Sequence, residues 1–548
     1  MEATPHLSTV AFIFWPVSSS SGNNCTACDR QTGTMADAKD PENDATERAL
    51  TSQQHSAAGD RSPDDTDRAI GEKDVHNGNP AQNVAIPDSN IVDWDGPDDP
   101  ANPRNWSKAY KMTNIALVSF AVLYTNLATT LFAPAASLMQ AEFGFESDTV
   151  EILTITIASL GFAVGQLFVA PLSEVFGRLP IYRASSIFYL GFTAGCARST
   201  HVAEFLVFRL CTGLSAASYM STGGGTVADL LPKEERGLAM AMFTAGPLFG
   251  PVTGPIVGGF VTQDLSWRWT FYLVLMLAGA VTIASFVVMR ETSAVAILKA
   301  KAARLRKETG NPSLRAAGDK QTPINQLVAH ALIRPIKFLV KSPIVSLTSV
   351  YIAFNFGVTM LLFATFPLVF QDTYHWTVGI SGLAYIGVGV GCAVGIVISA
   401  KLSDRLLRAP DGKYRAERRL ILMMYVSPVM PIGLFIYGWT TQYKVHWILP
   451  IIGTAISAPG VVVINSAAQT YLLDIFGPLA AASAIAAMTL LRNLMGAFVP
   501  LAAPSLYANL GLGWGNSVLA FVTVAFIPVP FFFYWRGEWL REKFPVKI

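Results

Sequence analysis

Ionisable side chains are rare in the long apolar stretches of this sequence, and those present mark where charge chemistry is expected. Glu151, Asp229 and Arg209 lie inside such stretches or near their ends. A carboxylate there can carry a proton, whereas arginine keeps its proton and would hold water or shift the pKa of a neighbour. We predict these three as proton-coupling residues, with a structural role for each as the alternative.

No Asp or Glu stands in the middle of an apolar stretch. This leaves the proton carrier unassigned and argues against a strongly cationic ligand bound by a deep carboxylate. Arg209 costs roughly 2.5–3.5 kcal/mol to place in a bilayer, so it indicates a function or a good partner. The alternative is a side chain that reaches the nearby outer interface.

Enzyme chemistry has no support in the sequence. None of the seven histidines is paired at metal-ligand spacing, and the CxxC at Cys25 and Cys28 has no second pair to complete a zinc site. No nucleophile motif and no GxxxxGK[ST] phosphate loop is present. We expect no enzymatic activity, no metal and no cofactor, and the net charge of +2 favours no nucleic-acid partner.

The elements that carry these residues are long and apolar. Of 548 residues, 51% are hydrophobic and 14% charged, against about a quarter charged in soluble domains. A bilayer needs roughly 20 apolar residues per helix. Twelve such spans fit, predicting an all-α integral membrane protein, near 112–132, 151–171, 181–198, 205–226, 238–261, 269–289, 344–369, 378–400, 420–438, 446–471, 480–504 and 517–535.

This pattern divides the chain into five parts. We expect a disordered cytosolic tail over 1–105, a six-helix half over 106–290, a basic cytosolic linker over 291–341, a second half over 342–536 and a cytosolic tail over 537–548. Within the linker, 295–309 is typical of a basic surface helix. Translation could start at Met1 or at Met35.

Loop charges predict the orientation. With the N-terminus in the cytosol, the inside loops carry nearly all loop Lys and Arg residues, and the outside loops carry only Arg198, Arg268 and Lys444. The positive-inside rule then places both termini in the cytosol.

The two sets of six spans have related features. The segment 173–178 (SEVFGR) ends the second span and 403–408 (SDRLLR) ends the eighth. Asp229 and Asp474 close the fourth and tenth spans, while Arg209 and Arg492 stand in the fourth and eleventh. Duplicated halves joined by a basic loop are typical of secondary transporters.

Several segments resemble the major facilitator superfamily, and more closely its fungal twelve-span drug:proton antiporters. They are the lead-in 92–100 (VDWDGPDDP) with 102–106 (NPRNW), and 165–183 (GQLFVAPLSEVFGRLPIYR) between spans two and three. The resemblance implies the twelve-helix fold of that superfamily in two six-helix halves. It covers the chain from about residue 92 to the C-terminus.

The loop motif implies a conformational latch. A carboxylate at a helix end can bind a basic partner or a helix N-terminus, and such a contact would break and re-form as the halves rock. The alternative is a positive-inside anchor with a tight glycine turn. The gating residues implied are Gly165, Glu174, Gly177, Arg178, Asp404 and Arg405.

The fifth span resembles the antiporter motif of the family. Glycines four apart make a smooth face for close helix packing, and prolines permit bending. This face could seal the pore on one side; the alternative is a kinked packing helix without bearing on direction. Its residues are Gly246, Pro247, Gly250, Pro251, Gly254, Pro255, Gly258 and Gly259.

In the resembling fold, spans one, four, seven and ten line the cavity. Polar and aromatic residues there are candidate substrate contacts, although helix packing is the default role of each. They are Tyr124, Asn126, Thr129, Tyr219, Ser221, Tyr351, Asn355, Phe356, Asn465 and Gln469.

The resemblance predicts an exporter of drugs, toxins or secondary metabolites, coupled to protons by alternating access. One proton crossing roughly 100 mV releases about 2.3 kcal/mol, and a tenfold gradient costs about 1.4 kcal/mol. Polyamine export and nutrient uptake are the alternatives, with a membrane enzyme or a sensor more remote. We expect a monomer in the plasma membrane, or alternatively in the vacuolar membrane.

Overall fold

The computed structural model describes residues 90–232, 235–319, 324–407 and 415–544. Side chains are described in these ranges except at 324, 325, 327, 328, 330, 331, 403–407, 478 and 479. The described residues all belong to one compact unit. The tail expected before residue 90, with Cys25 and Cys28, lies outside the described residues.

The first half is built from long helices joined by short turns. Ser107 and Ser147 cap two of these helices, each accepting a backbone N–H with its side-chain oxygen, and Gly144 ends another in the left-handed conformation. The helices are α1 (Lys108–Thr130), α2 (Ala136–Phe143), α3 (Asp148–Phe176), α4 (Arg178–Arg198), α5 (Val202–Leu230), α6 (Arg236–Asp264) and α7 (Trp267–Val288). A 3₁₀ turn, η2 (Ala133–Ala135), precedes α2.

The second half has the same character, with two breaks inside long helices. Gly477 (φ 69°) interrupts α15 and Gly511 (φ 70°) interrupts α16. Its helices are α10 (Pro343–Tyr374), α11 (Val378–Ser381), α12 (Ile386–Leu407), α13 (Arg419–Val426), α14 (Val429–Gln442), α15 (Ile448–Phe498), α16 (Ala503–Phe526) and α17 (Pro528–Lys543). Its 3₁₀ turns are η4 (Gly382–Tyr385), η5 (Ala416–Arg418) and η6 (Val499–Ala502).

The described residues contain nine helical segments that are long and apolar enough to cross a membrane. One of them, Ala480–Lys543, is 64 residues long and contains the break at Gly511. The expected spans 181–198 and 205–226 are helical, as α4 and α5, but they are not among these nine segments. Twelve crossings result only when α4 and α5 are added to the nine segments and Ala480–Lys543 is counted as two. The number of crossings therefore stays a prediction.

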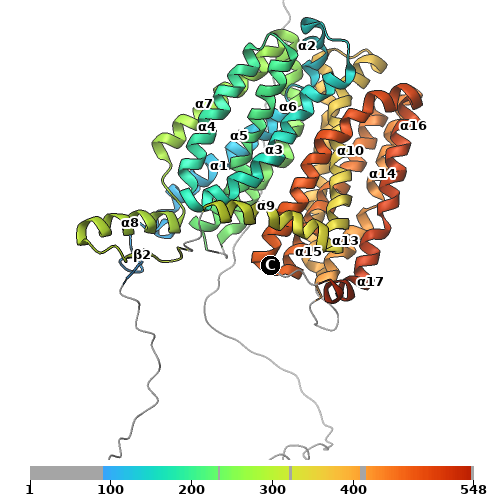
Figure 1. Ribbon diagram of the computed structural model, residues 1–548. Helices are drawn as coiled ribbons and strands as arrows, with labels where there is room; N and C mark the ends of the chain where they lie inside the picture. Colours follow the sequence, from blue (N-terminus) through green and yellow to red (C-terminus); the bar gives the residue numbers. More distant parts are fainter. Residues whose placement is uncertain (1–89, 233–234, 320–323, 408–414, 545–548) are drawn as a thin grey trace, which may run out of the picture. The chain divides into compact units, whose positions relative to one another are not determined.

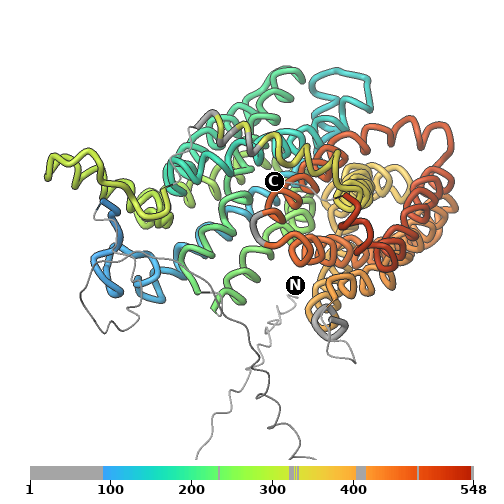
Figure 2. The backbone as a smooth tube through the Cα atoms, turned by 60° about the horizontal axis from the view of Figure 1, so that its bottom comes forward, coloured from blue at the N-terminus to red at the C-terminus, as the bar shows by residue number. Residues whose placement is uncertain are grey.

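Figure 1 shows the first-half helices, blue to green, beside the second-half helices, yellow to red, and Figure 2 shows the same division from another direction. The largest buried apolar cluster is continuous across both groups: Phe132 and Phe205 come from the first half, Phe366 and Phe370 from the second. Outward faces remain apolar, as at Val287, which is 79% exposed. An apolar surface around a packed bundle is what a lipid environment favours.

Two linker helices lie at one end of the bundle, α8 (Ala294–Thr309) and α9 (Ile324–Lys341). The start of α1 and the end of α17 lie at this same end (Figure 1). The two termini of the bundle therefore share a side with the linker, while the identity of that side as cytosolic stays a prediction.

Residues 90–106, most of them inside the segment expected to be a tail, pack against the linker. β1 (Ile91–Val92) pairs in parallel with β2 (Arg315–Ala316), and a 3₁₀ turn, η1 (Pro103–Asn105), follows. Figure 2 shows this lead-in beside α8. Lys301 of α8 donates to Asp95 (2.6 Å) and to the Asp93 carbonyl (2.9 Å).

Asp99 organises the lead-in. Backbone N–H groups of Asp95 and Ala101 and, to a smaller extent, the charge of Lys301 lower the pKa of its carboxyl. Asp99 is therefore ionised at neutral pH, and its contribution is lost only as the pH falls through that lowered pKa.

Candidate functional site

A cavity of about 670 Å³ lies between the two groups of helices. Its walls come from α1, α3, α4, α5 and α6 in the first half and α10, α12, α13, α14 and α15 in the second. Six of the residues expected as substrate contacts line it: Asn126, Thr129, Asn355, Phe356, Asn465 and Gln469. A cavity of this size, with apolar walls and a few amides, suits a small organic molecule.

The amide side chains of this cavity are partly committed to their own helices. Asn126 Nδ2 donates to the Val122 carbonyl and Asn355 Nδ2 to the Tyr351 carbonyl, both at 2.8 Å. Their amide oxygens are not used in these bonds. Asn465 Oδ1 is buried and has no partner among the described residues. These amides can therefore still bind a ligand without breaking a bond already made.

Tyr124 and Tyr219, also expected at the cavity, pack in an aromatic cluster and are not among its lining residues. The ring of Tyr219 stacks on Tyr182 (5.5 Å) and its hydroxyl bonds to Ser186 (2.5 Å). Tyr189, not singled out from the sequence, connects this cluster to the cavity wall. Ser221 and Tyr351 likewise do not line the cavity, and Tyr351 donates to Ser427 at 3.0 Å.

Arg209 is 3% exposed and lines the cavity from α5. Its guanidinium donates to the carbonyls of Ala128 (3.1 Å) and Thr129 (3.0 Å) in the last turn of α1 and lies over the ring of Phe271. The last carbonyls of a helix have no partner within it and carry partial negative charge, so a cation is stabilised there. Carbonyl oxygens, and no carboxylate among the described residues, compensate Arg209.

Arg492 lines the same cavity from α15. In the sequence it is noted only as the second-half counterpart of Arg209. Its guanidinium lies 5.0 Å from the centre of the Phe356 ring. Within the described part of the chain it has no hydrogen-bond or ion-pair partner, and its Nε atom is buried. Arg419 is the third arginine of the lining, and it forms an ion pair with Asp474 at 3.0 Å.

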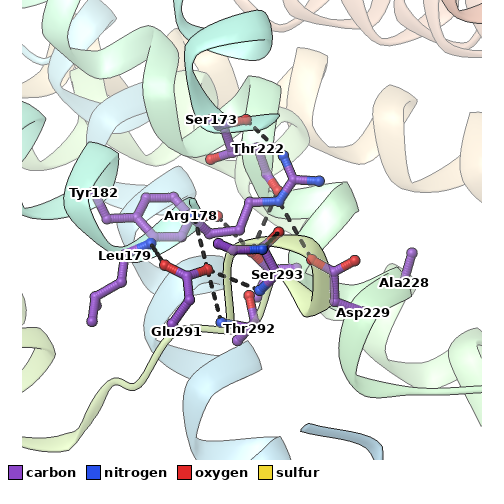
Figure 3. Close-up of polar contacts among 12 residues, drawn as sticks. Ser173, Arg178, Leu179, Tyr182, Thr222, Ala228, Asp229, Glu291, Thr292 and Ser293 are labelled. Atoms are coloured by element: carbon purple, nitrogen blue, oxygen red, sulfur yellow. Dashed lines mark hydrogen bonds and ion pairs between the residues drawn. The ribbon is translucent and has the colours of Figure 1, made fainter. Parts of the chain in front are cut away.

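A second polar site surrounds the turn between α3 and α4 (Figure 3). Arg178 donates to Ser173 (2.6 Å) and forms an ion pair with Asp229 at the end of α5 (3.4 Å). Glu291, in the segment between α7 and α8, accepts the backbone N–H groups of Arg178 (2.9 Å) and Leu179 (3.0 Å). The first N–H groups of a helix have no acceptor within it, and its N-terminus carries partial positive charge. A carboxylate at the start of α4 therefore accepts these N–H groups and is stabilised by the helix dipole.

Gly177 is required at this turn for two reasons. Its φ of 94° is in the left-handed region, and a Cβ atom would lie 2.5 Å from Glu291 Oε2. Sequence reasoning missed Glu291, since it follows the sixth span and only the tertiary fold brings it to this turn.

The other expected gating and coupling residues fall in different surroundings. Glu174 is exposed and has no polar partner in the part of the chain that is described. The side chains of Asp404 and Arg405 lie outside the described residues. Gly165 packs α3 against α5, where a Cβ atom would lie 2.7 Å from that of Ala217. Glu151 is 3% exposed, and its Oε1 atom has no partner among the described groups.

The glycines of the fifth-span motif hold α6 close to α1. A Cβ atom at Gly246 would lie 2.8 Å from Leu123 N, and one at Gly254 would lie 2.6 Å from Leu127 O. Gly250 and Gly258 face the same helix, against Leu127 N and Leu131 O. Backbones approach this closely only where side chains are absent.

Gly259, at the end of the motif, faces the other half of the molecule. A Cβ atom there would lie 2.7 Å from the carbonyl of Val378, the first residue of α11 in the segment that leads to α12. Gln263 of α6 accepts the N–H of Gly379 (3.0 Å), and Gly382 packs on the Pro255 carbonyl. The two halves are in close contact at this end of α6.

Comparison with known proteins adds independent information. A family model described as "Major Facilitator Superfamily" matches residues 118–500. The chain is 56% identical over 458 residues to "MFS transporter prlG" of Fungal sp. (strain NRRL 50135), covering 83% of this chain and 97% of that protein. It is 49% identical to the "Trichosetin biosynthesis cluster MFS transporter" of Gibberella fujikuroi, covering 84% and 91%.

Among solved structures, a D-xylose-proton symporter superposes with a TM-score of 0.59 at 16% identity, covering 77% of this chain and 99% of that one. At this identity the likeness concerns the fold alone.

Proposed function

Since the chain belongs to the major facilitator superfamily of membrane transporters, we propose that it exports a small organic molecule, of the secondary-metabolite class, by alternating access. The observation that carries the proposal is the 670 Å³ cavity between the halves, with apolar walls and several amides. A relative whose name includes a biosynthesis cluster supports a metabolite as cargo.

The contacts of α6 provide the gate that an export cycle requires. Its glycines seal it to α1, and Gly259 and Gln263 seal it to the segment before α12. In the proposed cycle the contacts of Gly259 and Gln263 with the second half form one gate: they hold while the cavity loads from the linker side and break when it releases cargo on the other side.

Coupling to protons is the second part of the proposal. Glu151 is a buried carboxyl without a partner on Oε1 among the described residues, and it is the preferred proton carrier. Asp229 is less suited, because its carboxylate is already held in an ion pair with Arg178. Arg209 is committed to the α1 carbonyls and has a positioning role.

Polyamine export is less consistent with this cavity. Among the described lining residues there are three arginines and no Asp or Glu, so a polycation would be repelled and would find no counter-ion. Uptake of a nutrient remains the alternative function, and the experiment below distinguishes it from export.

The test is retention of compounds in a yeast strain that lacks its own pumps. Cells that produce the chain should retain less of some members of a panel of fungicides, neutral dyes and polyamines than cells without it. A protonophore should remove the difference. Higher retention would indicate uptake, and a difference unchanged by the protonophore would contradict proton coupling.

A further inference from the structure

The cavity has a strongly one-sided charge. Of the described residues that line it, Arg209, Arg419 and Arg492 are the only charged ones, and all three are cationic. Two of them are compensated within the protein: Arg209 by carbonyls of α1 and Arg419 by Asp474. Arg492 differs from both. Among the described residues, the ring of Phe356 is the only group that contacts and partly stabilises its charge.

Arg492 is partly buried, and its Nε atom is fully buried without a partner among the described residues. A cation held in this way without an anion beside it is unfavourable. The face of an aromatic ring offsets part of that cost, but it leaves the N–H donors without acceptors. A planar guanidinium matches the two oxygens of a carboxylate, which makes an acidic group the best-fitting missing partner. The ring of Phe356 and the apolar walls then suit the rest of such a molecule.

We infer that the cargo is an amphipathic organic anion and that Arg492 binds its acidic group. This rests on the proposed function, and it narrows the cargo from small organic molecules in general to weak acids that are ionised in the cytosol. The unpartnered oxygen of Asn465 suits a hydroxyl or N–H donor elsewhere on the same molecule.

The experiment uses matched probes in the same yeast strain. Naphthalene and biphenyl skeletons are each tested as the acetic acid, the acetamide and the ethylamine. The apolar skeleton then stays constant, and the head group is anionic, neutral or cationic. The chain should lower the retention of the two acids about tenfold more than that of the amides and amines. This comparison uses the unmodified chain and needs no variant to fold.

Variants then assign the preference to Arg492. Arg492→Gln should raise the KM for the acids and leave that for the amides unchanged, whereas Arg492→Lys should keep part of the preference. The matched control is Arg183→Gln, because Arg183 also lies over a phenylalanine ring, at 4.8 Å, but does not line the cavity. Membrane abundance of each variant is measured with a C-terminal tag.

The outcomes separate the two claims. Export of amides or amines as efficient as that of acids would overturn the inference and leave the proposed function standing. A preference for acids that survives in Arg492→Gln would overturn the role of Arg492. Unchanged retention of all six probes would contradict the proposed function itself.

Discussion

At the scale of single residues, Glu291 is the clearest structural determinant near the α3–α4 turn. One carboxylate accepts four backbone N–H groups, those of Arg178, Leu179, Thr292 and Ser293. It thereby fixes the start of α4 to the segment that leaves α7. The loop motif in the sequence drew attention to Glu174, yet the carboxylates that contact this turn are Glu291 and Asp229.

We expect Glu291→Gln to destabilise the protein by about 1–3 kcal/mol, because an amide lacks the charge and presents an N–H group to donors. The measurement is the thermal unfolding midpoint of the purified protein, together with transport rate. Glu174→Gln is the matched control and should change neither. If Glu174→Gln lowers transport as much as Glu291→Gln does, the latch assigned from the sequence motif is correct and our assignment is not.

Glu151 gives a prediction about coupling at the same scale. Glu151→Gln should abolish proton-driven accumulation while leaving exchange of cargo across the membrane in the absence of a gradient. The reason is that an amide keeps the shape of the carboxylic acid but cannot release a proton. Both activities can be measured in one vesicle preparation. Coupled transport by Glu151→Gln at the wild-type rate would exclude Glu151 as the carrier.

At the scale of elements, the packing of α6 on α1 depends on the absence of side chains. Gly254→Ala would place a Cβ atom 2.6 Å from Leu127 O and 2.7 Å from Thr130 Oγ1, so one helix must move. We expect a substantial loss of transport, of the order of tenfold, with normal delivery to the membrane.

The matched control for Gly254→Ala is Gly279→Ala in α7, where a Cβ atom would meet nothing within 4 Å. Retention in cells measures both. Equal effects of the two substitutions would show that a general stiffening of the helices, and not the α1–α6 contact, explains the loss.

The elements themselves were largely predictable, because hydropathy and loop charge reflect the solvent around each helix. Which residues of each helix face the cavity was less predictable. Asn126 and Asn355 line the cavity as expected, whereas Tyr124 and Tyr219, on the same helices α1 and α5 as cavity residues, pack in the aromatic cluster. Helices with neighbours on several sides have weak amphipathicity, so composition alone does not identify the cavity side.

The contact between the lead-in and the linker was also beyond sequence reasoning. Low hydrophobicity indicated a tail up to residue 105, but β1 pairs with β2 and Val92 is buried against Leu298 of α8. These partners are about 200 residues apart in the sequence, and no local pattern connects them.

At the scale of the whole molecule, two halves surround one cavity. They touch where Gly259 and Gln263 meet the segment before α12, and the cavity with its three arginines lies between them. Alternating access requires these contacts to break while others form on the linker side. The driving energy is adequate, since one proton at roughly 100 mV supports a cargo gradient somewhat above tenfold.

The most direct measurement is transport by the purified chain in proteoliposomes under an imposed pH gradient, using the probe with the largest retention difference in cells. We expect cargo to move against its gradient when protons flow the other way, with a proton flux that a lumenal pH dye records. Cargo movement that is unaffected by collapsing the pH gradient, or that follows protons in the same direction, would contradict the account.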